Sequence, residues 1–178
     1  MKSTLIMMMV PAGCGKSHLA KKIEDTHEDC IIVSRDDIRF ALLKPGEEYF
    51  AHEKEVEHLF YQTISDMLLV HKYVIADATH ITSTSRNRFF DKVKIPSKTK
   101  TIGVWVEVDE TTAQKQNEIR TGLRKVPSEA ISRMYKYKVS PAQNEPFDDI
   151  IYISAHTDQA ISTFNPTVGK IIDRLAEI

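Results

Sequence analysis

This sequence has few cysteines, no long apolar run and almost no net charge, and each shortage excludes a class of protein. Cys14 and Cys30 are the only cysteines among 178 residues, so a disulfide framework is excluded and a reducing, cytoplasmic location is expected. No apolar stretch is long enough to span a membrane, so we expect no membrane partner. The net charge of −1 excludes a protein that coats nucleic acid by bulk electrostatics, but it allows a local basic site.

Apolar runs of strand length alternate along the chain with segments of helical periodicity. This alternation is typical of an α/β fold with crossover connections and a mostly parallel sheet. Five strands are predicted, at residues 4–10, 30–33, 73–76, 101–108 and 150–153. Helices are predicted at residues 16–26, 36–43, 47–70, 83–93 and 111–120, from Pro127 onwards, and along a final stripe of Val168, Ile171, Ile172 and Leu175. The length and the 42% hydrophobic content predict a single domain, residues 1–178.

The first predicted strand leads into a glycine-rich turn, residues 13–17, that reads Gly-Cys-Gly-Lys-Ser and precedes a helix. Backbone N–H groups of such a turn and the helix N-terminus bind nucleotide phosphates. Lys16 is then expected to reach the β- and γ-phosphates of ATP, and Ser17 to bind Mg²⁺ through its hydroxyl. The predicted nucleotide-binding residues are Gly13, Cys14, Gly15, Lys16, Ser17 and His18. Val10 stands where the full pattern has glycine, and the alternative is a chance Gly-Lys-Ser turn.

Two acids follow the next strands, at the edge of a parallel sheet where ligands bind. Asp36 can accept a proton from an attacking hydroxyl, and Arg39, one helical turn later, can hold an acceptor phosphate. The alternative for this pair is a helix-capping Asp with a surface salt bridge. Asp77 can organise Mg²⁺ or the acceptor hydroxyl, or it can cap a helix. Thr79 and Arg86 complete the predicted substrate-binding set, with a structural role as the alternative for Arg86.

Basic residues gather in the segment 115–138. A helix, a break at Gly122 and a new helix predict a small, mobile helical lid over residues 118–138. A lid arginine, Arg120 or Arg124, is expected to close on the γ-phosphate and to stabilise the charge of the transition state. The alternative is a solvated pair of helices.

Four elements in this order resemble one family of enzymes. They are the turn at 13–17, Ser-Arg-Asp-Asp-Ile-Arg at 34–39, Ile-Ala-Asp-Ala-Thr at 75–79, and Arg-Lys-Val-Pro with Ser-Arg-Met-Tyr-Lys between 124 and 136. From residue 5 to 138 the chain resembles the kinase domain of phage-type polynucleotide 5′-hydroxyl kinases, and residues 144–150 resemble the wider group of small zeta-toxin-like kinases. The resemblance implies a three-layer P-loop kinase fold, ATP with Mg²⁺, and a nucleic-acid 5′ end as acceptor.

The same resemblance implies individual roles. Lys16 and Ser17 match the residues that hold the ATP phosphates and the metal ion, and Asp36 matches the general base. Arg39 matches the contact to an acceptor phosphate, and Asp77 an acid that helps to place the acceptor hydroxyl. The catalytic lid arginine of the family falls at Arg120 or Arg124. The sequence departs from its relatives at Val10 and at His80, where relatives often have Asn.

Three functional hypotheses follow. The first is transfer of the γ-phosphate of ATP to the 5′-hydroxyl end of DNA or RNA. The second is a kinase that acts on a nucleoside, another small molecule or a hydroxylated base in DNA. The third is a nucleotide-dependent binding module or switch, which would need Lys16 and Ser17 but not Asp36. Residues 154–158 are the candidate adenine-binding region, and none of the three hypotheses fixes the oligomeric state.

Overall fold

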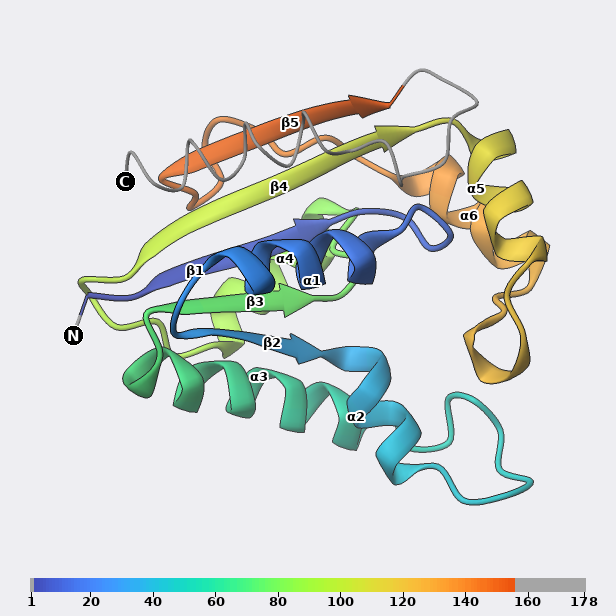
Figure 1. Ribbon diagram of the computed structural model, residues 1–178, viewed down its shortest axis with the longest axis horizontal. Helices are drawn as coiled ribbons and strands as arrows, with labels where there is room; N and C mark the ends of the chain where they lie inside the picture. The colour runs from blue at the N-terminus through green and yellow to red at the C-terminus, as the bar shows by residue number, and fades with distance from the viewer. Residues whose placement is uncertain (1, 156–178) are drawn as a thin grey trace.

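Five parallel strands form the central layer of the structure, a computed structural model that describes residues 2–155 (Figure 1). They are β1 (Thr4–Met9), β2 (Cys30–Ser34), β3 (Tyr73–Asp77), β4 (Lys100–Val108) and β5 (Asp149–Ala155). Their spatial order is β2-β3-β1-β4-β5, so the chain winds from β1 toward one edge and later crosses to β4 on the other side of β1. Ligands of such sheets bind beyond the carboxyl ends of the strands at this change of direction.

Helices cover both faces of the sheet in the described part of the chain (Figure 1). They are α1 (Lys16–Thr26), α2 (Arg35–Leu42), α3 (Glu53–Val70), α4 (Ser83–Lys92), α5 (Glu110–Glu118), the short 3-10 turn η1 (Gly122–Arg124) and α6 (Ser128–Tyr137). None of them is both long and apolar enough to cross a bilayer. The three-layer α/β fold is confirmed, while the last predicted helix lies outside the described residues.

The central strand β1 is buried on both faces. Leu5 and Met7 pack into a hydrophobic cluster with α3 and α4, while Ile6 and Met8 pack into a second cluster with α1. Successive side chains of a strand point to opposite faces, so both sets must be apolar when helices cover both sides. Burial on both faces explains why the apolar run before the glycine-rich turn is uninterrupted. Because β1 is the central strand, the turn that follows it lies at the centre of the sheet edge.

The long helix predicted from residue 47 begins at Glu53 instead, as α3. The preceding residues form turns, in which Gly46 has a φ of 87° and Phe50 is 67% exposed. The helix was predicted to begin more than one turn too early because the exposed Phe50 falls at helical spacing. These turns matter for the site because they place Tyr49 against α2.

Arg86 of α4 is fully buried and joins segments that are far apart in the sequence. Its guanidinium forms an ion pair with Glu145, with Nη2 donating to Oε1 at 2.7 Å. Nη1 donates to the backbone carbonyls of His80 and Val139 at 3.2 and 3.0 Å. Removing one partner of such a buried pair is strongly destabilising, so these contacts give Arg86 a structural role.

His80 is buried in an aromatic cluster behind the sheet edge, with a φ of 40°. Its ring stacks on Phe60 with centroids 6.0 Å apart and meets the edge of Phe89 at 5.1 Å. Nε2 has no hydrogen-bond partner among the described residues. Burial, together with the charges of nearby cations, lowers the pKa of His80 to about 3.

Acidification from pH 7 to pH 5 is therefore expected to cost about 2 kcal/mol of folding free energy through His80. A histidine in the unfolded chain takes up a proton near pH 6.5, whereas folded His80 stays neutral down to about pH 3. The unfolded state gains protons first, so stability falls with pH between these values. Urea unfolding of the wild type and of His80→Asn at both pH values measures this, since Asn tolerates a positive φ. Equal acid losses in the two proteins would contradict the assignment.

Candidate functional site

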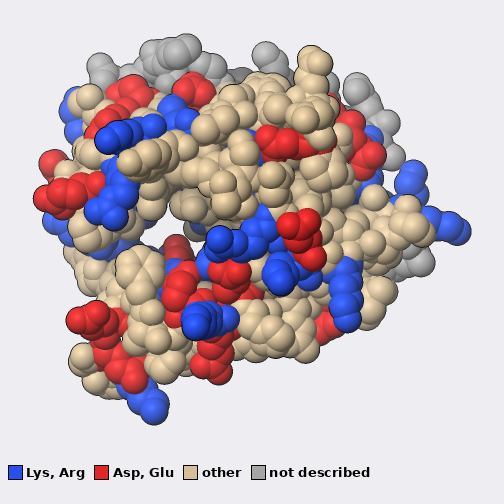
Figure 2. Space-filling view, turned by 180° about the vertical axis from the view of Figure 1, so that it is seen from behind, with Lys and Arg blue, Asp and Glu red and all other residues tan. Residues whose placement is uncertain are grey.

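Two adjacent pockets lie beyond the carboxyl ends of β1, β2 and β3. Pocket A, of about 430 Å³, is lined by the glycine-rich turn, the start of α2 and part of residues 118–138. These residues are predicted to form a lid, and we call them the lid segment. Pocket B, of about 510 Å³, is lined by α2, the loop before α3, and α6. The two pockets share Ala12, Lys16, Asp36, Tyr49, Thr79, Leu123 and Val126. Figure 2 shows the hollow between the lid segment and α2 from behind, with basic and acidic side chains along its walls.

The glycine-rich turn has the backbone that its glycines allow. Gly13 and Gly15 have φ values of 87° and 75°, a region that is costly for other residues, and Gly15 is the N-cap of α1. Val10 has no positive φ, and its N–H donates to the Thr79 carbonyl at 3.1 Å. The departure from the full pattern therefore falls at a position where the backbone conformation does not require glycine.

Gly13→Ala is expected to destabilise the protein more than Gly46→Ala. Both glycines have a φ of 87°, so each substitution costs about 1 kcal/mol of backbone strain. A Cβ at residue 13 would lie 2.5 Å from the carbonyl oxygen of Ala113 in α5, whereas one at residue 46 has nothing within 4 Å. This overlap is expected to add about 1–3 kcal/mol. Urea unfolding of both variants measures the difference, and equal losses would contradict a tight fit between the turn and α5.

Lys16 and Ser17, in the first turn of α1, both contact Asp77 at the end of β3. Lys16 Nζ forms an ion pair with Asp77 Oδ1, and Ser17 Oγ donates to Oδ2 at 2.8 Å. Lys16 and Asp77 are both buried, so each compensates the charge of the other. Asp77 lies beside the glycine-rich turn and lines neither pocket.

The oxygens of Ser17 and Asp77 suit a magnesium ion that shares its shell with phosphates. Mg²⁺ takes hard oxygen ligands and is usually held by one or two carboxylates together with substrate phosphates and water. Ser17 Oγ and Asp77 Oδ2 are 2.8 Å apart and offer two such ligands. Within residues 2–155, no group of three or more His, Cys, Asp or Glu side chains could hold a metal ion. The chain thus offers a partial shell that nucleotide phosphates would complete.

Cys14 directs its side chain toward α6 and not into either pocket. Its Sγ lies 3.4 Å from the hydroxyl of Tyr135, which donates to the Val108 carbonyl at 2.9 Å. Burial raises the pKa of the Cys14 thiol, so the thiol stays protonated. The side chain ties the glycine-rich turn to the base of the lid segment, and the backbone N–H is the part of Cys14 suited to a phosphate.

Asp36 lines both pockets from the first turn of α2. The cap of this helix is Ser34, whose side chain accepts from the Asp37 N–H at 3.2 Å, so Asp36 is free of the capping role considered for it. Asp36 Oδ1 accepts from Arg39 Nη1 at 2.6 Å and from the Tyr49 hydroxyl at 3.1 Å. The side chain remains 51% exposed, and Oδ2 has no hydrogen-bond partner among the described residues.

Arg39 is buried behind Asp36. Its Nη2 donates to Glu53 Oε2 at 2.8 Å, and its guanidinium lies over the Tyr49 ring, 4.6 Å from the centroid. Burial alone would lower the pKa of Arg39, but the hydrogen bond to Glu53 and the surrounding charges raise it above its ordinary value. The cation is therefore permanent and already faces two carboxylates.

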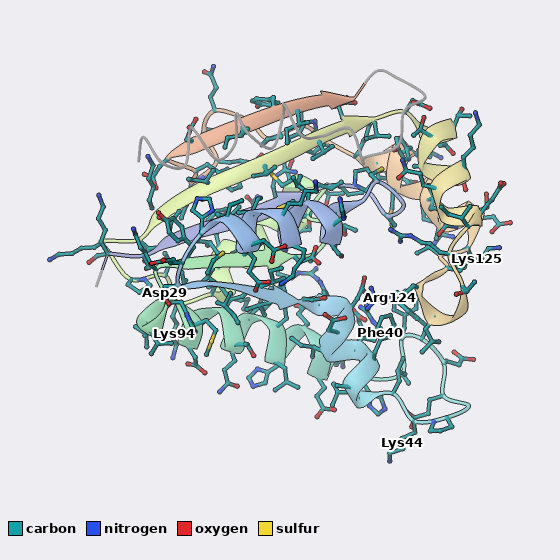
Figure 3. The ribbon with its side chains drawn as sticks, in the orientation of Figure 1. Asp29, Phe40, Lys44, Lys94, Arg124 and Lys125 are labelled. Carbon is teal, nitrogen blue, oxygen red and sulfur yellow. The ribbon has the colours of Figure 1, made fainter. Side chains whose placement is uncertain are left out.

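The two predicted lid arginines have different surroundings. Arg120 lines pocket A, has no ion pair among the described residues, and lies near enough to Cys14 for its charge to oppose the rise of that thiol's pKa. Arg124 reaches from η1 toward α2, where Nη2 lies 3.5 Å from Asp37 Oδ1 and the guanidinium lies 5.9 Å from the Phe40 ring centroid (Figure 3). Both arginines line pocket A, and Arg124 also connects the lid segment to α2.

Most of the predicted site residues line one or both pockets. These are Gly13, Gly15, Lys16, Ser17, His18, Asp36, Arg39, Thr79, Arg120 and Arg124. Cys14 and Asp77 contact the site from outside the pockets, and Arg86 lies apart from it. Sequence patterns missed Tyr49 and Glu53, because they were assigned to one long helix. The Pro-Gly pair at 45–46 was the available signal that a loop follows.

The strand order and the glycine-rich turn define a P-loop kinase fold. The chain belongs to the AAA_33 family (AAA domain), which residues 5–138 match. No curated protein matches this sequence.

Solved structures share the fold at low sequence identity. A gluconokinase from Sinorhizobium meliloti 1021 has 16% identity and a TM-score of 0.63, with 99% of this chain and 95% of that chain covered. Chaetomium thermophilum Kti12 in complex with ADP-AlF3 has 13% identity and a TM-score of 0.70, with 97% of each chain covered. A fungal RNA kinase has 13% identity and a TM-score of 0.63, with 98% of this chain and 44% of that chain covered. The narrower resemblance to phage-type polynucleotide kinases stays a prediction.

Proposed function

We propose that this protein transfers the γ-phosphate of ATP to a hydroxyl, and that the acceptor is the 5′-hydroxyl end of DNA or RNA. The observation that carries the proposal is the position of Asp36, which lines both the pocket of the glycine-rich turn and the neighbouring pocket. A carboxylate at such a junction can reach the hydroxyl of an acceptor in pocket B while the phosphates of a nucleotide lie in pocket A.

On the donor side, the backbone N–H groups of residues 13–17 and the N-terminus of α1 would hold the ATP phosphates. Lys16 would exchange part of its contact with Asp77 for the β- and γ-phosphates. Ser17 and Asp77 would hold Mg²⁺, which when bound neutralises phosphate charge and orients the γ-phosphoryl group. Arg120 would add positive charge to the γ-phosphate as residues 118–138 close as a lid.

On the acceptor side, Asp36 Oδ2 would take the proton of the attacking hydroxyl. The hydroxyl oxygen forms a bond to the γ-phosphorus as the bond between that phosphorus and the β–γ bridging oxygen breaks. ADP leaves with the electron pair of the broken bond, and the proton passes from Asp36 to solvent. The charge that spreads over the transferring group is met by Lys16 and Arg120.

Pocket B supports a nucleic-acid acceptor. Phe50 and Tyr49 line it, and Phe50 is 67% exposed, which leaves an aromatic face on which a base can stack. Lys125 lines the same pocket and can attract phosphate. The likeness of the fold to the fungal RNA kinase structure is consistent with this acceptor class.

A transfer assay with γ-labelled ATP and Mg²⁺ tests the proposal. The acceptors are DNA and RNA oligonucleotides with a free 5′-hydroxyl, the same oligonucleotides with a 5′-phosphate, nucleosides and gluconate. Label at free 5′-hydroxyl ends alone is the expected result. Transfer to nucleosides or gluconate but not to oligonucleotides would show that the acceptor is a small molecule. Pocket B, at about 510 Å³, also has room for one. ATP binding without transfer to any acceptor would favour a nucleotide-dependent binding module.

A further inference from the structure

Three side chains behind Asp36 form a connected polar cluster, which we call the brace: Arg39, Tyr49 and Glu53. Tyr49 donates to Asp36 Oδ1 at 3.1 Å, and Arg39 Nη1 lies within hydrogen-bond distance of both Asp36 Oδ1 and the Tyr49 oxygen, at 2.6 and 3.1 Å. Glu53 accepts from Arg39 Nη2 at 2.8 Å. The brace therefore holds one oxygen of Asp36 by two donors and leaves the other oxygen to the pockets.

The far end of the brace is anchored to the start of α3. Glu53 is the first residue of this helix, where the helix dipole favours a negative charge. Its second oxygen, Oε1, accepts from Arg35 Nη2 at 2.5 Å. Glu53 is thus fixed by two arginines of α2 and by its own helix, so it can hold the Arg39 guanidinium in one orientation.

Arg39 links Glu53 to Asp36 and lines pocket B. It is 5% exposed, and Nη1 and Nη2 already donate to Asp36, Tyr49 and Glu53. Its Nε is buried and has no hydrogen-bond partner among the described residues. The guanidinium thus connects Asp36 on one side to Glu53 on the other.

Tyr49 is suited to act as a permanent donor in the brace. Burial and the charge of Asp36 raise the pKa of the Tyr49 hydroxyl, so it keeps its proton across the physiological range. Its ring lies against the Arg39 guanidinium, 4.6 Å from the centroid, and restricts the guanidinium plane. Asp36 Oδ1 therefore meets donors whose direction is set by packing.

We propose that Arg39, Tyr49 and Glu53 are positioning residues that fix Asp36 between the two pockets. The inference rests on the proposed function, because it assumes that Asp36 takes the proton of the acceptor. It assigns a role to Tyr49 and Glu53, two residues that the sequence patterns missed.

Tyr49→Phe isolates one donor of the brace, and Tyr152→Phe is its matched control. Tyr152 lies on β5, lines neither pocket and loses one hydroxyl in the same way. We expect Tyr49→Phe to lower kcat about tenfold, the effect of one hydrogen bond to a charged group, with the KM for ATP unchanged. An unchanged kcat in Tyr49→Phe, or an equal loss in Tyr152→Phe, would overturn the proposal.

Arg39 is tested by pairing its variants with two acceptors that differ by one charge. One oligonucleotide has an ordinary first phosphodiester next to the 5′-hydroxyl, and the other has a neutral methylphosphonate there. We expect Arg39→Gln to lower kcat about 10²-fold on both, because a misplaced base affects either acceptor. Arg39→Lys should restore little, since one ammonium cannot span Asp36 and Glu53. A loss confined to the charged acceptor and rescued by lysine would assign Arg39 to the phosphate and overturn the brace.

The wild type separates failure of this inference from failure of the proposed function. If it does not phosphorylate the unmodified oligonucleotide, the proposed function is contradicted and the brace with it. If the wild type does phosphorylate it, the two acceptors and Tyr49→Phe test only the positioning role of the brace. Glu53→Gln gives an independent test, and Glu55→Gln on the exposed side of the same helix is its control. We expect Glu53→Gln to lower kcat and to leave the affinity for ATP unchanged.

Discussion

Lys16→Ala is expected to lower kcat for phosphoryl transfer about 10³-fold, because the cation that lines both pockets is lost. Lys16 lies in the first turn of α1 and is held by Asp77, so its ammonium is already oriented beside the phosphate site. The first turn of α1 holds no other lysine or arginine. Steady-state transfer with γ-labelled ATP measures the loss, and near-normal turnover would contradict the phosphate-binding role of the turn.

Lys21→Ala is the matched control for this substitution. Lys21 lies on the same helix, is 62% exposed and pairs with Glu24 and Asp25 on the surface. Because Lys16→Ala also leaves Asp77 without its cation, the double variant Lys16→Ala/Asp77→Asn removes the unpaired buried charge. Urea unfolding shows whether each variant is folded. Asp77→Asn alone is assayed beside it, because Asp77 is also a proposed Mg²⁺ ligand. A folded double variant that transfers less phosphate than Asp77→Asn assigns the further loss to Lys16.

Asp36→Asn is expected to lower transfer about 10³-fold while ATP affinity is kept. The amide has nearly the same shape and its oxygen can still accept from Arg39 and Tyr49, but it cannot take a proton from the acceptor. Titration calorimetry with a non-hydrolysable ATP analogue and a transfer assay measure the two properties separately. Loss of transfer with intact nucleotide binding would exclude a pure binding module.

Asp37→Asn controls for the loss of one charge from the same turn of α2. Asp37 is the neighbouring residue, is 67% exposed and faces Arg124 of the lid segment. We expect its substitution to change kcat far less than Asp36→Asn, since an exposed ion pair contributes little. Similar losses in the two variants would mean that overall charge, and not proton transfer, explains the effect.

Local sequence patterns were sufficient wherever a feature depends on neighbouring residues. The apolar run of β1, the left-handed Gly13 and Gly15, and the helix that starts at Lys16 belong to one short segment, so the phosphate-binding turn could be predicted. The order of strands and helices was likewise predicted, because periodicity reports burial along each element. The start of α3 was wrong because the exposed Phe50 fell at helical spacing.

These patterns could not predict contacts between segments that are distant in the sequence. The pairing of Arg86 with Glu145 joins residues 59 positions apart, and no local spacing distinguishes it from a surface arginine. Similarly, the contact of Arg124 with Asp37 across the hollow joins two segments that are distant in the sequence. Such contacts are set by how the elements pack, which a single sequence records only indirectly.

The sequence by itself determined the class of fold and the chemical parts of the site: a phosphate-binding turn, an acid after β2, an acid after β3 and a basic lid segment. Tertiary structure alone decided how they are divided, with Asp77 beside the turn and Asp36 between the pockets, supported by Tyr49 and Glu53. The physical reason is the separation along the chain over which each effect acts. Strand periodicity and glycine conformation act over a few residues, whereas hydrogen bonds that orient a carboxylate come from whichever side chains the packed helices bring within about 3 Å.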